Sequence, residues 1–218
     1  MGSILTKIGI IVFFFIYSIF IFSLFNFRKR INILYFILFL LGIAAFLSVF
    51  IESPLEHLLA LLTSPSHWNI QSDILKAFLY SLIPGFVEEL FKALAAFTGK
   101  NKILSGASAG AGFGFGEVVF KLSHATYFSA GVSTGVLIAI IGKLLGITFH
   151  SSSTSLIMYG ATKRKFFLYY LIVSLIHTAV DTIGTTATIG PQLILGSIIT
   201  LSLFIISIAL YKREFAKG

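Results

Sequence analysis

The sequence predicts an all-α membrane protein, a bundle of seven transmembrane helices that forms a single polytopic domain over residues 1–218. Two observations predict this class. Hydrophobic residues make up 57% of the chain and charged residues only 11%, which is too little polar side chain to cover a soluble core of this size. The apolar residues also occur in runs long enough to cross a bilayer, separated by short polar stretches.

Seven apolar runs approach or exceed the roughly 20 residues that a helix needs to cross the hydrocarbon. They cover residues 4–27, 31–51, 74–98, 103–128, 132–160, 166–186 and 190–211. The first run is too long for the apolar part of a signal peptide and has no small-residue cleavage site, so we expect it to remain as a helix. The chain has no cysteine, which excludes disulfides, thiolate metal ligands and a cysteine nucleophile.

The basic residues lie between the runs and give the chain a formal net charge of +8. They follow the first, third, fifth and seventh runs, whereas the opposite loops hold almost no lysine or arginine. The positive-inside rule then places the N-terminus outside and the C-terminus in the cytoplasm, in a multi-pass protein of the cell membrane. Basic residues in this pattern indicate contact with the lipid bilayer and not with nucleic acid. The sequence leaves the oligomeric state open.

One long loop, residues 52–73, is predicted on the outer side. Its leucines can form a short helix on the membrane surface, with Pro65 ending the helix and Trp68 as an interface anchor. Such a helix is either a gate for substrate or a simple connection, and both interpretations stay open. His57 and His67 also lie in this loop, where we expect them to be exposed.

The run at 74–98 contains two adjacent carboxylates, Glu88 and Glu89, followed by Lys92. Ionised groups at membrane depth cost several kcal/mol unless they are paired, hydrated or bound. Lys92 lies four residues after Glu88 and three after Glu89, so it can pair with either on one helix face. A buried ion pair that fixes helix packing would account for one glutamate but not for two. We therefore predict that this pair is the centre of an intramembrane active site.

Small residues form two stripes at i, i+4 spacing, a pattern that permits close helix contact. The stripe on the fourth run consists of Gly106, Gly110 and Gly114, and the stripe on the fifth consists of Gly142, Gly146, His150 and Thr154. Glu117 continues the first stripe, so it should face a neighbouring helix and not lipid. On the sixth run Asp181 lies four residues after His177, where a carboxylate can orient an imidazole that acts as a base or binds a metal.

Position along each run predicts that these groups share one depth. Glu88 lies about 14 residues, or about 21 Å, from the outer end of its helix. Glu117 lies a similar distance from the inner end of the next helix. With tilt, these two groups, His150 and His177 can all meet near the bilayer midplane. Four ionisable groups at one depth on four consecutive helices predict a shared hydrated site.

The combined pattern, Glu88-Glu89-x-x-Lys92, Phe113-x-x-x-Glu117, His150 and His177-x-x-x-Asp181, resembles the PrsW family of intramembrane proteases. That family is distantly similar to the CAAX-processing endopeptidases and to the seven-helix anterior-pharynx-defective subunit of gamma-secretase. The resemblance covers residues 74–186. The gamma-secretase subunit is a scaffold without the Glu-Glu pair, so that pair favours an enzyme here. The predicted catalytic residues are Glu88, Glu89, Glu117, His150 and His177, with Lys92, Asp181 and Thr154 in supporting roles.

Two mechanisms of peptide hydrolysis remain open. In the first, one of the two glutamates deprotonates a water while His150 and His177 hold that water or stabilise the oxyanion. In the second, Glu117, His150 and His177 bind zinc and leave a position open for water, with a glutamate of the pair as base. We favour the metal-free route because the His-Glu-x-x-His pattern of soluble zinc proteases is absent, although the PrsW family is often described as metalloproteases.

We therefore expect an intramembrane endopeptidase that acts on membrane-anchored proteins or peptides. One alternative is a non-catalytic scaffold, in which the same polar groups hold the helices together and recruit a partner. The other is an ion transporter, since intramembrane glutamate, histidine and lysine also mark ion paths. The first three and the last three runs share no polar pattern, so no inverted repeat supports transport.

Overall fold

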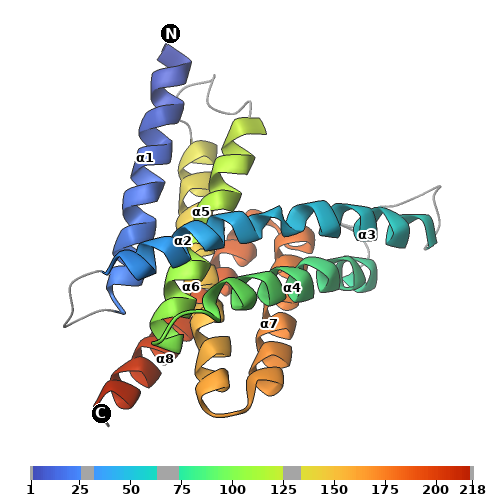
Figure 1. Ribbon diagram of the computed structural model, residues 1–218. Coiled ribbons are helices and arrows are strands. Elements are labelled where there is room, and N and C mark those ends of the chain that lie inside the picture. The colour runs from blue at the N-terminus through green and yellow to red at the C-terminus, as the bar shows by residue number, and fades with distance from the viewer. Residues whose placement is uncertain (1, 26–31, 63–73, 125–133, 217–218) are drawn as a thin grey trace.

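A computed structural model describes residues 2–25, 32–62, 74–124 and 134–216, and it confirms the all-α class, with no strand in these ranges. The described residues are almost entirely helical (Figure 1). In chain order they are α1 (Gly2–Ser23), α2 (Ile33–Ala45), the 3-10 turn η1 (Phe46–Ser48), α3 (Val49–Leu62), α4 (Ile74–Ala96), α5 (Lys102–His124), α6 (Thr134–Thr162), α7 (Phe166–Thr186) and α8 (Ile189–Phe215).

Six stretches within the described residues are long and apolar enough to cross a membrane, as expected of a multi-pass membrane protein. They are Ile4–Ser23, Ile33–Leu61, Lys102–Leu122, Gly135–Thr162, Phe166–Thr186 and Ile189–Glu214. The expected span at 74–98 forms α4 but is not among them, because Glu88, Glu89 and Lys92 reduce its apolar character. The count of seven spans therefore stays a prediction.

The helix expected over the leucines of the 52–73 loop is present as part of α3, but α3 begins at Val49 and continues the preceding run, which corrects the predicted boundary at residue 52. α2, η1 and α3 follow without a break and form one candidate span, and the helix continues through Pro54. Glu52 is buried, and Ser48 Oγ donates a hydrogen bond to it at 2.5 Å, so the carboxylate is satisfied inside the helix. His57 is exposed as expected. His67 and Trp68 lie outside the described residues.

α5 lies at the centre of the bundle and packs against α1, α2, α4 and α6. Every residue in the stretch 103–114 is buried, because small side chains let other helices approach from several sides. In Figure 1, α2, α3 and α4 run across the view, at a steep angle to α1, α5, α6, α7 and α8. The crossing brings the middle of α4 against α5, α6 and α7, where its charged residues lie.

Glycines set the distances between these helices. A Cβ at Gly110 would lie 2.0 Å from the carbonyl oxygen of His150, and one at Gly106 would lie 2.6 Å from that of Thr154. The predicted close helix contact at the glycine stripe of α5 is thereby confirmed, and the helix that it contacts is α6. Gly85 permits a close contact between α4 and α7 in the same way. A Cβ at Gly85 would lie 2.4 Å from Thr178 Oγ1 and 2.9 Å from the backbone oxygen of Ser174.

Replacing Gly110 with alanine is expected to lower the free energy of unfolding by about 1–3 kcal/mol or more, because the added methyl group forces α5 away from the α6 backbone. Gly9→Ala is the matched control, since no heavy atom of the described residues lies within 4 Å of its would-be Cβ. Unfolding in mixed detergent micelles measures both. Equal stability of the two variants would contradict the close contact between α5 and α6.

Candidate functional site

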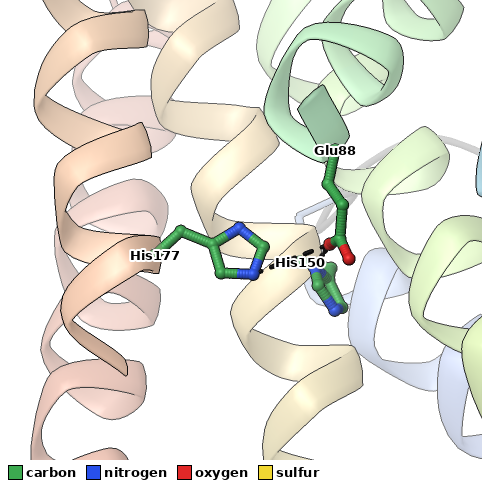
Figure 2. Close-up of side chains that lie close together, drawn as sticks. All are labelled: Glu88, His150 and His177. Carbon is green, nitrogen blue, oxygen red and sulfur yellow. Dashed lines mark ion pairs between the residues drawn. The ribbon is translucent and has the colours of Figure 1, made fainter. Parts of the chain in front are cut away.

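The ionisable residues singled out in the sequence lie together in the structure, on four helices. α4 contributes Glu88, Glu89 and Lys92, α5 contributes Glu117, α6 contributes His150, and α7 contributes His177 and Asp181. Figure 2 shows Glu88, His150 and His177 pointing toward one another from three of these helices. We call these seven residues the polar cluster.

Glu89 and Lys92 form the buried base of the polar cluster, and both side chains are 0% exposed. Lys92 Nζ donates to Glu89 Oε1 at 2.8 Å. The same oxygen lies 3.0 Å from His177 Nδ1, and Ser153 Oγ donates to Glu89 Oε2 at 3.3 Å. Both oxygens of Glu89 are therefore occupied by protein donors. Glu89 is placed to fix Lys92 and His177, and not to bind a water.

His150 is held at both ring nitrogens. Its Nδ1 lies 2.8 Å from Lys92 Nζ, and its Nε2 lies 3.0 Å from Glu117 Oε2. An ammonium group can only donate, so Nδ1 accepts and Nε2 carries the proton that is donated to Glu117. Glu117 also pairs with Lys121 and with Lys143, the latter at 3.4 Å.

His177 presents one nitrogen to the remaining carboxylates. Its Nδ1 faces Glu89, so this nitrogen donates and Nε2 is left on the opposite side of the ring. Nε2 lies 3.6 Å from Glu88 Oε2 and 3.5 Å from Asp181 Oδ2. Asp181 was expected to orient this imidazole. Glu89 Oε1 lies 3.0 Å from the His177 ring, closer than Asp181 Oδ2 at 3.5 Å. Glu89 is therefore the main group that orients His177, and the sequence pattern did not predict this.

Glu88 Oε2 differs from every other carboxylate oxygen of the polar cluster. It is a buried atom without a hydrogen-bond partner among the described residues. Three nitrogens surround it beyond hydrogen-bond distance: His177 Nε2 at 3.6 Å, Lys92 Nζ at 3.7 Å and His150 Nδ1 at 3.9 Å. A buried carboxylate oxygen in this position requires a donor, and a water molecule between it and His177 would supply one.

Thr154 lies outside the polar cluster, although it was predicted to support the site. Its hydroxyl donates to the backbone oxygen of His150 at 2.8 Å, one turn earlier in α6. Ser151 and Ser155 donate to backbone oxygens of α5. The hydroxyl run on α6 therefore contributes to helix packing.

Two cavities reach the polar cluster from different sides. One, of about 390 Å³, lies among α3, α4, α5 and α7, and the other, of about 370 Å³, lies among α6, α7 and α8. Both are lined by Glu117, His150, His177, Asp181 and Gly184. The first is also lined by Glu52, Glu56 and Tyr80, which the sequence analysis did not assign to the site. Tyr80 donates to Glu56 Oε2 at 2.9 Å.

A metal site can be tested against these contacts. Ligand atoms of Glu88, His150 and His177 lie within 4.8 Å of one another, so Glu88 takes the place that the predicted zinc set gave to Glu117. Two histidines and one carboxylate suit zinc by type. The arrangement does not, because the ammonium of Lys92 occupies His150 Nδ1 and Glu117 occupies its Nε2. The contacts of His150 therefore favour a site that activates water without a metal.

Comparisons of the chain with protein-family models, with curated proteins and with solved structures gave no significant match. The resemblance to the PrsW family therefore stays a prediction that rests on the motifs quoted above.

Proposed function

We propose that the chain is an intramembrane endopeptidase of the PrsW type that hydrolyses peptide bonds of membrane-anchored proteins or peptides. The observation that carries this proposal is the buried Glu88 Oε2, which makes ion pairs with Lys92 and two imidazoles at 3.6–3.9 Å but has no hydrogen-bond partner among the described residues. Glu88 also lines a cavity. A packing cluster gains more from a carboxylate that is fully hydrogen-bonded, whereas a general base requires an oxygen that can accept a proton.

The contacts assign separate tasks to the polar cluster. Water bound between Glu88 Oε2 and His177 Nε2 gives its proton to Glu88 as it attacks the scissile carbonyl carbon. The same proton then passes to the leaving amine. Lys92 Nζ lies 3.7 Å from Glu88 Oε2 and, from the buried base of the polar cluster, stabilises the negative charge that develops on the substrate through its electric field. Glu89 and Glu117 hold Lys92, His177 and His150 in place.

The test is cleavage of membrane-anchored peptides by the purified chain in lipid nanodiscs, with products identified by mass spectrometry. Cleavage is expected, and it is expected to survive exhaustive chelation because Lys92 and Glu117 already occupy His150. Activity that is lost on chelation and restored by zinc would contradict the metal-free route but support a protease. Absence of cleavage across a broad peptide library would contradict the proposed function itself.

The proposed enzyme has seven membrane segments, with α4 as the third, its N-terminus outside and its C-terminus in the cytoplasm of the cell. The lysines and arginines at the ends of α4, α6 and α8 support this orientation by the positive-inside rule. The polar cluster then lies within the bilayer, because α4 crosses the bundle next to the middle of α5 and α6.

A non-catalytic scaffold and an ion transporter are the other candidates. The contacts that join Glu89 to α6 and α7 favour a scaffold, because they link three helices. The two cavities that meet at the polar cluster favour a transporter, because charged groups between two openings resemble an ion path. Ion flux in liposomes that depends on Glu88 would support the transporter, and a stable stoichiometric partner without cleavage would support the scaffold.

A further inference from the structure

The cavity among α6, α7 and α8 has an apolar part and a polar end. Residues of α6 and α8 form the apolar part: Ile138, Ala139, Leu145, Ile189 and Leu193. The polar end is formed by Glu117, His150, His177 and Asp181, which also line the other cavity. Its volume of about 370 Å³ is within the range of sites that bind small ligands or a few side chains.

We propose that this cavity binds the apolar flank of the substrate, an extended peptide segment that enters between α6 and α8 and places its scissile bond at the polar cluster. The inference rests on the proposed function. It adds a binding site for the substrate and a preference for apolar residues next to the cleaved bond.

Glycines in the cavity wall give the first argument. Gly142, Gly146 and Gly196 line the cavity, and no heavy atom of the described residues lies within 4 Å of their would-be Cβ atoms. At glycines that pack helices together, such as Gly106 and Gly110, a Cβ would instead lie within 3 Å of the neighbouring helix backbone. Open space at a helical glycine occurs elsewhere, as at Gly9, but here three such glycines lie in one cavity wall and leave the helix backbone bare beside the open space.

Polar groups in the same wall indicate a peptide and not a lipid tail. Lys143, Gln192 and Thr200 line the cavity among the apolar residues. Peptide backbone groups that enter a membrane site require hydrogen-bond partners, and these side chains can supply them. A hydrocarbon tail offers no hydrogen-bonding groups to these side chains.

The first experiment compares Gly146→Leu with Gly9→Leu, using one peptide with a long apolar flank and one in which that flank is removed. Both glycines have open space at Cβ within the described part of the chain, so neither substitution should disturb the fold. Gly146→Leu is expected to lower kcat/KM for the long peptide by about 10-fold or more relative to the short peptide, mainly through KM. Gly9→Leu should match the wild type on both. An unchanged rate, or an equal loss on both peptides, would overturn the proposal.

The second experiment measures binding without catalysis, which separates this inference from the proposed function. An apolar photoreactive peptide is expected to label α6 and α8 in the wild type and in Gly9→Leu but not in Gly146→Leu. Labelling without cleavage of any peptide would support the binding site and contradict the protease. Cleavage with labelling elsewhere would overturn the binding site alone. A photoreactive phospholipid that labels α6 and α8 and is not displaced by excess peptide would also overturn it.

Discussion

Replacing Glu88 with glutamine is expected to lower kcat for peptide cleavage by about 10²–10⁴-fold, the usual contribution of a general base. Glutamine keeps the size of the side chain but cannot take a proton from water. The substitution removes no hydrogen bond from Glu88 Oε2, which has no hydrogen-bond partner among the described residues, but it removes the charge that pairs with Lys92 at 3.7 Å. The variant is expected to stay folded. The rate at saturating substrate and the unfolding midpoint, measured on the same preparation, test the effect on catalysis and on stability.

Glu214→Gln is the matched control for this prediction. Glu214 lies in the last turn of α8 and pairs with Lys163 at 2.8 Å, outside the polar cluster. Its variant should keep the wild-type kcat. A Glu88→Gln protein that cleaves at the wild-type rate would remove Glu88 from the role of base. Loss of fold in that variant would point to a packing role.

Replacing Lys92 with methionine is expected to lower the free energy of unfolding by about 3–5 kcal/mol, the cost of leaving a buried charge without its partner. Glu89 is 0% exposed and would keep only the contacts with His177 and Ser153. Methionine fills a similar volume, so little of the effect comes from a cavity. Unfolding in mixed micelles gives the value.

The double variant Lys92→Met/Glu89→Gln shows whether charge is the cause. Glutamine removes the buried negative charge and can still bond with His177, so the double variant should recover much of the lost stability. Lys163→Met, which breaks a partly exposed pair, should cost about 1 kcal/mol or less. Additive losses in the double variant would show that the ion pair is not the source of the effect.

The sequence predicted that the ionisable groups of four helices converge, and Glu88, Glu117, His150 and His177 do lie together. The predicted common depth stays a prediction, because α4 crosses α5, α6 and α7 at a steep angle (Figure 1), so that distance along α4 does not measure depth. The sequence did not separate Glu88 from Glu89, because both can reach Lys92 within one helical turn. In the structure the rotation of about 100° per residue directs Glu89 into the buried base and leaves Glu88 at the cavity wall.

The part that the sequence did not predict is the continuity of α2, η1 and α3. The apolar run was expected to end at residue 51 and a separate short helix to form over the leucines of the 52–73 loop, whereas the structure is helical from Ile33 to Leu62. The hydrogen bond from Ser48 to Glu52 satisfies one carboxylate, and Tyr80 satisfies Glu56, so the helix continues. Ser48 lies four residues before Glu52, so its bond is local to the helix. The contact of Tyr80 with Glu56 depends on the packing of α4 against α3, which the local sequence does not indicate.

Close glycine contacts hold the helices of the site in two pairs. Gly106 and Gly110 bring the α5 backbone against the α6 backbone, and Gly85 brings α4 against α7. Glu117 and His150 lie on the first pair, whereas Glu88 and His177 lie on the second. The Lys92–His150 and Ser153–Glu89 hydrogen bonds join the two pairs at the site, and Gly160, whose Cβ would lie 2.6 Å from Tyr169, brings α6 against α7 near the other end of these helices. Because Glu88 and His177 lie on the same pair, a movement of one pair against the other would keep the proposed base beside the imidazole with which it holds the water.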